Sequence, residues 1–202
     1  MSGDDEGAAP DRSRWVALGA VSAGVVVVTL DTTILNVAIP TIRRDLGTDL
    51  VSLVWVVTGY SLTLGSLLVI GGRLGDVFGA RRTFVAGALV FAAGSVVASA
   101  ATSVWMLGLG ESVVEGIGAA LLLPAALATL STLFRDRERA KAFAVWGGAA
   151  GAASALGPVI GGWLATDASW RWGFRINVVV APLAALLAAR VLPRAQHHRA
   201  LA

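Results

Sequence analysis

Three acidic residues interrupt the apolar stretches of this chain: Asp31, Glu111 and Glu115. A carboxylate is costly in hydrocarbon, so an ionisable residue inside a membrane segment is a candidate for function. No Lys or Arg lies at the same depth to neutralise these acids, and burial without a cation favours the protonated form of a carboxylic acid. Groups of this kind carry protons or bind cations, and the three acids are therefore the first site prediction.

The spacing of the three acids predicts that they lie at similar depth. Asp31 is about eight residues, roughly 12 Å at about 1.5 Å per residue, from the Pro40 end of its stretch. Glu111 lies about seven residues into a later stretch that enters from the same side. Glu115 follows one helical turn deeper on the same face. The alternative is that the acids are simply hydrated, Glu111 above all, because it lies nearest to the membrane surface.

The composition places these acids in a membrane protein. The 202 residues are 56% hydrophobic and 14% charged, with a mean hydropathy of +0.75, whereas a soluble domain carries about 25% charge. The chain has no cysteine, which excludes disulfides and thiolate sites. Its two histidines, His197 and His198, lie in a polar tail and are expected to be solvated. Basic residues flank the apolar stretches, a pattern typical of membrane topology signals rather than of nucleic-acid binding.

Six apolar stretches reach the roughly 20 residues that a membrane-spanning helix needs. They cover about residues 15–39, 52–71, 83–101, 104–134, 140–165 and 172–192, and Pro40 and Pro193 are expected to end the first and the last. The sequence thus predicts an all-α integral membrane domain of six transmembrane helices over about residues 15–192. Residues 1–14 are polar and acidic and predict a disordered tail, and residues 193–202 form a second tail.

An even number of spans places both termini on the same side of the membrane. Of the 16 Lys and Arg residues, 12 fall on that side, and the positive-inside rule then makes it the cytoplasm. The predicted localisation is the cell membrane, multi-pass, with both termini cytoplasmic. The 12 residues are Arg12, Arg14, Arg73, Arg81, Arg82, Arg135, Arg137, Arg139, Lys141, Arg190, Arg194 and Arg199.

Two further runs hold candidate residues. Residues 72–82 (GRLGDVFGARR) separate the second and third spans, and we expect a tight cytoplasmic loop whose charges act on neighbouring helix ends. The fifth span carries small residues four apart, which allow close helix approach, and a proline that bends the helix; simple tight packing is the alternative. The candidates are Gly72, Asp76, Gly79, Arg81 and Arg82 in the first run, and Gly157, Pro158, Gly161 and Gly162 in the second.

Several patterns, in order along about residues 15–192, resemble the major facilitator superfamily, and specifically its fourteen-helix drug:proton antiporter branch. Residues 30–40 (LDTTILNVAIP) resemble the first-helix motif of the branch, and residues 72–82 the superfamily's loop between helices two and three. Residues 157–162 (GPVIGG) resemble the antiporter motif of helix five, and residues 170–178 (WRWGFRINV) the start of helix six. Residues 55–60 (WVVTGY) also fit the second helix of the branch.

The resemblance implies one six-helix half of a transporter that exports hydrophobic drugs or antibiotics, driven by the proton gradient without a cofactor. It implies that Asp31 faces a central cavity and that Asp76, with Arg81 and Arg82, locks the outward-open state. The glycine–proline kink of helix five would act where the two halves meet. Structural roles, hydrogen bonds among them, are implied for Asn36, Asn177, Trp170 and Arg171.

The fourth span departs from the family pattern. The resemblance implies R-x-x-Q-G-x-G-A-A there, with an arginine that serves proton coupling, but residues 112–120 read SVVEGIGAA. Ser112 replaces the arginine and Glu115 the glutamine, which makes the local charge more negative. In the loop motif, Val77 and Ala80 replace two basic positions.

One six-helix half encloses no pathway by itself, so we expect a second transporter half or a homodimer besides the lipid bilayer and a small hydrophobic substrate. The substrate's identity stays open. The alternative is a truncated or degenerate membrane protein that does not transport and acts as a binding or regulatory partner. An enzyme is not expected, since the sequence has no metal-ligand motif, nucleophile–base pair or phosphate-binding loop.

Overall fold

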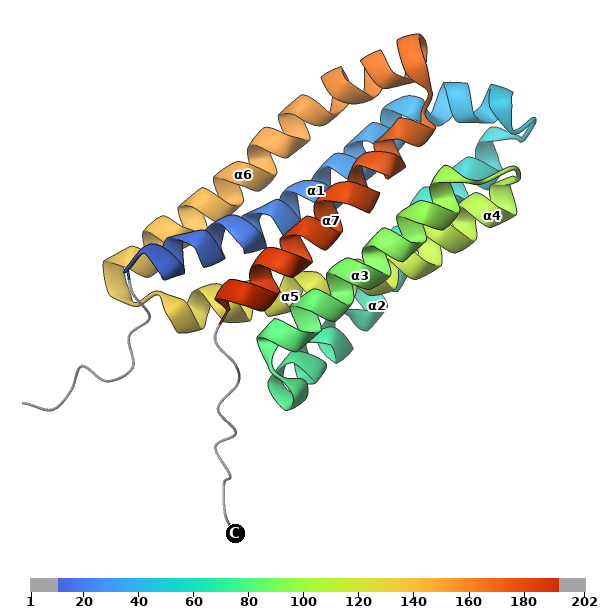
Figure 1. The fold of residues 1–202 in the computed structure, drawn as a ribbon. Coiled ribbons are helices and arrows are strands. Elements are labelled where there is room, and N and C mark those ends of the chain that lie inside the picture. The colour runs from blue at the N-terminus through green and yellow to red at the C-terminus, as the bar shows by residue number, and fades with distance from the viewer. Residues whose placement is uncertain (1–10, 193–202) are drawn as a thin grey trace, which may run out of the picture.

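A computed structural model describes residues 11–192 as an all-helical bundle (Figure 1). Six helices are long and apolar enough to cross a membrane, as predicted. Short π-helical segments, η1 and η2, continue two of them, so that α4, η1 and α5 form one span and α6 and η2 another. The elements are α1 (Asp11–Asp45), α2 (Leu50–Phe78), α3 (Ala80–Ser99), α4 (Val104–Gly108), η1 (Leu109–Glu115), α5 (Gly116–Leu133), α6 (Asp136–Trp163), η2 (Leu164–Ala168) and α7 (Arg171–Val191).

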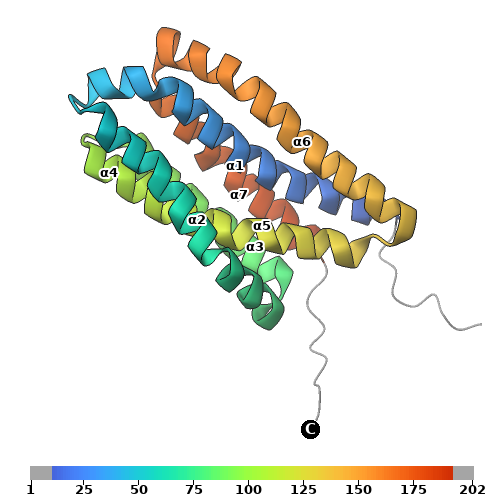
Figure 2. The same cartoon turned by 180° about the vertical axis from the view of Figure 1, so that it is seen from behind.

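The helices contact one another in the spatial order α6, α1, α7, α3, α5 and α2. Figures 1 and 2 show α6 at one side of the bundle and α2 at the other, with α1 and α7 between α6 and α3. The two outer helices are the least buried of the six spans. Their exposed apolar side chains include Trp55 and Val69 on α2 and Val159 on α6. The acidic residues of interest are on the inner spans.

Glycines let α3 and α5 approach closely. A Cβ on Gly118 would lie 2.5 Å from the backbone nitrogen of Phe91, and one on Gly87 would lie 2.7 Å from that of Leu122. Such distances leave no space for any side chain. Small residues serve the same purpose between helices in membranes generally, since the lipid supplies no hydrophobic drive for helix association.

Two of the expected boundaries are wrong at the start of the chain. The first helix does not end at Pro40 but continues to Asp45. The residues beyond the proline are held by packing, because Ile42 is fully buried in a cluster with Leu53 and Phe174. Residues 11–14 are helical rather than part of a disordered tail. The remainder of that tail, and residues 193–202 with the proline at 193, lie outside the described residues.

The polar run at residues 72–82 is also not the loop that was expected. Helix α2 continues to Phe78 and α3 begins at Ala80, so Gly79 alone separates them. Gly79 has φ +91°, a conformation that glycine adopts without steric cost. Its N–H donates to the carbonyl of Gly75 at 2.9 Å, and its own carbonyl accepts from the N–H of Thr83 at 3.1 Å. The charges of the run therefore lie on helix ends.

At the opposite end, α2 begins with a side-chain cap. Asp49 accepts a hydrogen bond from the backbone N–H of Ser52 at 2.8 Å and another from the Ser52 hydroxyl at 2.9 Å. An aspartate in this position satisfies a backbone donor that the helix leaves unpaired. The hydrogen bonds from Ser52 hold the pKa of Asp49 below its ordinary value.

The glycine contacts yield a stability prediction. Gly118→Ala should lower the free energy of unfolding by about 1–3 kcal/mol, because its methyl group must push α3 away from α5. Thermal unfolding in detergent measures the change. Gly148→Ala is the matched control, since a Cβ at this exposed position of α6 would meet nothing within 4 Å. Equal melting temperatures for the two variants would contradict the packing argument.

Candidate functional site

The three predicted acids lie together inside the bundle. Asp31 comes from α1, and Glu111 and Glu115 come from η1. One carboxylate oxygen of each residue lies within 4.8 Å of the other two. Asp31 is 3% exposed and both glutamates are 0% exposed. The alternative that Glu111 is hydrated at the membrane surface is therefore wrong, because protein covers its side chain.

The local backbone makes room for the glutamates. Both lie in η1, a π-helical turn, and π-helical insertions occur frequently at functional sites. The neighbouring helix α3 has a glycine opposite: a Cβ on Gly94 would lie 2.5 Å from Cγ of Glu115. A larger residue at Gly94 would thus occupy the space of the Glu115 side chain.

Two polar side chains orient the acids. The amide nitrogen Nδ2 of Asn177, on α7, donates to Oδ1 of Asp31 at 2.5 Å. The hydroxyl of Ser95, on α3, lies 2.7 Å from Oε1 of Glu115. Both orienting residues are buried. In contrast, Asn36 is exposed and donates to the Thr32 carbonyl of its own helix at 2.7 Å, so it has no part in the cluster.

Four buried oxygens of the cluster accept no hydrogen bond from a residue outside it: Oδ2 of Asp31, both carboxylate oxygens of Glu111 and Oε2 of Glu115. The three acids can hydrogen-bond one another when they share a proton. No Lys or Arg side chain is buried among residues 13–192. Three carboxylates this close do not all stay ionised without a counter-charge. The arrangement can therefore hold protons or a cation.

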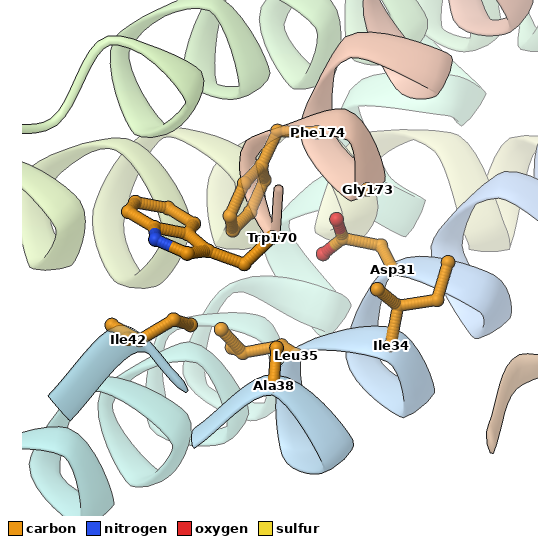
Figure 3. Close-up of a pocket in the computed structure, with 8 residues that line it drawn as sticks. All are labelled: Asp31, Ile34, Leu35, Ala38, Ile42, Trp170, Gly173 and Phe174. Carbon is orange, nitrogen blue, oxygen red and sulfur yellow. The ribbon is translucent and has the colours of Figure 1, made fainter. Parts of the chain in front are cut away.

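Asp31 lies inside the bundle. Its carboxylate lines a narrow pocket between α1 and α7, without room for a water molecule. Figure 3 shows the side chain with Ile34 and Leu35 of α1 on one side and Gly173 and Phe174 of α7 on the other. The hydrogen bond from Asn177 holds the carboxylate in this position, inside the bundle.

Ser112, the residue at the arginine position of the family pattern, is not part of the cluster. Its buried hydroxyl donates to the carbonyl of Val56 on α2 at 2.7 Å. Gly59 of α2 is equally close, because a Cβ there would lie 3.0 Å from Cβ of Ser112. The serine therefore joins η1 to α2.

The candidate residues of the polar run divide into two groups. Arg81 donates to the carbonyl of Ala189, in the last turn of α7, where a cation is favourable because unpaired carbonyls carry partial negative charge. Asp76 and Arg82 are exposed. A Cβ on Gly72 would lie in ordinary contact with Pro124, 3.9 Å from its Cβ. Only Arg81 of these charged groups has a described contact with another span.

The small residues of α6 face α1. A Cβ on Gly157 would overlap Thr33, and one on Gly161 would lie 2.9 Å from Cα of Ile34. Gly162 is packed less closely, because a Cβ there would lie 4.0 Å from Cγ1 of Val37. Pro158 is exposed, and α6 continues through it. The glycine pair thus serves close packing of α6 on α1.

Trp170 and Arg171 connect three parts of the chain at the opposite end from Arg81. The indole nitrogen of Trp170 and the guanidinium of Arg171 donate to Oδ2 of Asp45, at 3.0 and 2.5 Å. Arg171 also donates to the carbonyl of Ala101 at 2.8 Å. These contacts hold the end of α1, the α3–α4 connection and the start of α7 together.

The sequence analysis missed Ser95 as a neighbour of Glu115 and assigned Asn177 only a structural role. A single serine in an apolar span carries no signal of its own. The relevant information is which residue lies across the helix interface, and this depends on helix rotation. The sequence predicted that the three acids lie at similar depth, and the tertiary structure brings their oxygens within 4.8 Å of one another.

The Arg171 contacts predict a stability effect. Arg171→Ala should lower the free energy of unfolding by about 1–2 kcal/mol, because a charged hydrogen-bond network is lost at the helix ends. Arg175→Ala is the control: this exposed arginine contacts the ring of Trp172, and its loss should cost about 0.5 kcal/mol or less. Chemical unfolding in detergent measures the free energy of unfolding of both variants. An equal decrease in the two would contradict the role of Arg171 in holding the three segments together.

Comparisons with known proteins identify the relatives of this chain. Residues 21–201 match the family model of the Major Facilitator Superfamily. The chain is 44% identical over 186 residues to the puromycin resistance protein of Streptomyces alboniger, covering 92% of this chain and 37% of that protein. It is 40% identical over 178 residues to the tetracenomycin C resistance and export protein of Streptomyces glaucescens, covering 88% and 33%. The chain thus spans about a third of these relatives.

Solved structures share the fold at lower identity. A crystal structure of a peptide transporter in complex with sulfate has a TM-score of 0.77 and 19% identity, with 89% of this chain and 37% of that chain covered. A proton:xylose symporter of the major facilitator superfamily has a TM-score of 0.77 and 16% identity, with 91% and 46% covered. At these identities the likeness concerns the fold alone.

Proposed function

Because this chain belongs to the Major Facilitator Superfamily, we propose that it is a six-helix unit of a proton-coupled exporter of hydrophobic drugs or antibiotics. Relatives at 38–44% identity include four antibiotic resistance proteins, one of which is also described as an export protein. The chain is a multi-pass membrane protein and, as a member of a transporter family, not an enzyme, as the sequence predicted. The observation that carries the proposal is the convergence of Asp31, Glu111 and Glu115.

Proton coupling follows from the physical chemistry of the acid cluster. Adding a proton removes a buried charge, and removing one restores repulsion between neighbouring carboxylates. Each change alters the free energy of the arrangement that brings Asp31 of α1 close to the glutamates of η1. Protonation from one side of the membrane and release to the other would thereby be linked to helix rearrangement.

Transport would need a second six-helix unit, either another transporter half or a second copy of this chain. The apolar surfaces of α2 and α6 support this, because they lie at the two sides of the bundle and remain exposed (Figure 2). Lipid covers whatever part of them a partner does not. A drug-binding cavity would then form between units, since the pocket beside Asp31 has no room for a water molecule.

The orientation we propose places both termini in the cytoplasm of a cell-membrane protein. The distribution of Lys and Arg along the sequence supports it through the positive-inside rule. In this orientation the exposed Asp76 and Arg82 lie at the cytoplasmic ends of α2 and α3, available to a gating contact with the partner unit. Arg81 would hold α7 to α3 during that motion.

A transport assay tests the proposal. Puromycin is added to inverted membrane vesicles that contain the chain, alone and together with a second transporter half, and proton release is followed with a pH-sensitive dye. We expect puromycin-dependent proton movement in at least one arrangement. Asp31→Asn and Glu115→Gln should lower its initial rate by about tenfold or more, because each removes a proton-binding group.

The control for the transport assay is Asp167→Asn, which changes an exposed acid at the far end of the η2 segment. It should leave the rate unchanged. Proton movement that is the same in Asp31→Asn as in the unchanged chain would refute coupling through the cluster. If no arrangement moves protons with puromycin or with other hydrophobic antibiotics, the non-transporting binding partner becomes the better description of the chain.

A further inference from the structure

We propose that Arg175 and Trp172, in the first two turns of α7, bind the phosphate of an anionic phospholipid at the membrane surface. The inference goes beyond the proposed function, because lipid binding requires neither proton coupling nor drug export. It rests on the place of Arg175 on an exposed stripe of α7, on the direction of its guanidinium group, and on the lack of an acidic partner on the helices that form this surface.

One side of α7 carries exposed side chains along most of its length. The helix lies between α1 and α3 and packs against both (Figure 1). The exposed residues are spaced three or four apart and therefore lie on one helix face; they are Trp172, Arg175, Val179, Leu183 and Leu186. Arg175 is the only charged residue of this stripe. It is thus a cation on a face that otherwise suits lipid.

Arg175 lies close to the membrane surface, and its side chain turns toward that surface. It is four residues, about 6 Å at about 1.5 Å per residue, inside the first residue of α7. Its guanidinium carbon lies 5.0 Å from the centroid of the Trp172 ring, and Trp172 is about one turn nearer to the start of the helix. Long basic side chains near the ends of membrane spans direct their charge to the polar surface in this way.

Exposed tryptophans mark the membrane surface at this end of the bundle. Besides Trp172, they are Trp55 near the start of α2, Trp105 near the start of α4 and Trp163 at the end of α6. These helix ends lie at the same end of the bundle as the start of α7, because successive spans alternate in direction. Tryptophan is enriched at the level of the lipid headgroups. The ring that Arg175 contacts therefore lies at the level of the lipid phosphates.

Arg175 has no acidic partner on the helices that form this surface. Neither α3 nor α7 contains an aspartate or a glutamate. At the nearby end of α1, Asp45 is held by Trp170 and Arg171. Arg175 forms no ion pair within the part of the chain that the structure describes. Its counter-charge therefore comes from outside the described residues.

A phospholipid phosphate suits this position. A guanidinium group binds phosphate oxygens through two parallel hydrogen bonds, and the membrane supplies phosphate at the level of its headgroups. An anionic phospholipid fits better than a zwitterionic one, because a zwitterionic headgroup carries its own ammonium group, which competes with the arginine for the phosphate. The acyl chains would lie along the apolar part of the stripe, beside Val179 and Leu183.

A lipid titration tests the inference. The purified chain in detergent is titrated with phosphatidylglycerol or with phosphatidylcholine of the same acyl chains, and native mass spectrometry measures the bound lipid. We expect phosphatidylglycerol to bind more tightly. Arg175→Gln should weaken its first binding step by about fivefold, because a basic residue at the membrane surface is lost. The matched control is Arg44→Gln, which removes an exposed arginine from the last turn of α1, at the same end of the bundle, and should bind the lipid as the unchanged chain does.

A second pair of variants tests the aromatic ring. Trp172→Leu should weaken phosphatidylglycerol binding by about twofold, because the guanidinium group loses the ring that orients it. Trp105→Leu removes an exposed tryptophan at the same end of the bundle and should leave binding unchanged. Arg175→Gln should melt close to the unchanged chain in detergent without lipid, since the side chain is exposed. Phosphatidylglycerol should then raise its melting temperature less than that of Arg44→Gln.

Several outcomes would overturn the lipid site. They are equal phosphatidylglycerol binding by Arg175→Gln and the unchanged chain, an equal loss in Arg44→Gln, and equal binding of the two lipids. Displacement of the lipid by inorganic phosphate would indicate a site for a soluble anion instead. A dimer that Arg175→Gln dissociates would indicate that an acid of a second copy covers the arginine. None of these measurements depends on drug or proton movement, so the site and the proposed function fail or stand separately.

Discussion

Negative charge buried between apolar helices is the constraint on which the rest of this structure depends. Three carboxylates within 4.8 Å of one another repel strongly unless protons or a cation lie between them. Asn177 and Ser95 each satisfy one oxygen and fix the orientation of the acid that bears it. The other carboxylate oxygens accept no hydrogen bond from outside the cluster, and they are the atoms at which the site can bind protons or a cation.

Close helix packing leaves little space around the cluster. The absence of a side chain at Gly94 leaves room for the Glu115 side chain, and glycines of α3 and α5 let the two backbones come into contact. The helix ends are held separately: Arg171 joins α1, the α3–α4 connection and α7, while Arg81 joins α3 to the last turn of α7. Both arginines involve α7, which also carries Asn177. The clamps at the two ends thus bear on the helix that orients Asp31.

The exposed and buried surfaces of the bundle have different physical character. Helices α2 and α6 present apolar side chains outward, as a surface does that meets lipid or another helix unit. The charged chemistry is instead enclosed between α1, η1 and their neighbours. The inner and outer helices are joined by direct contacts: Ser112 hydrogen-bonds η1 to α2, and Gly161 places α6 against α1.

Hydropathy alone determined that there are six spans, because about 20 apolar residues in a row have few other stable states. The free-energy cost of a charged side chain inside the membrane was enough to single out Asp31, Glu111 and Glu115, since unpaired charges are rare in membrane spans. The tertiary structure decided what local patterns do not encode: that packing of Ile42 carries α1 past Pro40, and that Gly79 alone joins α2 and α3. It also decided that Asp31 turns to Asn177 inside the bundle and that Ser95 lies beside Glu115. These features depend on helix rotation and contact, which residues distant in sequence set together.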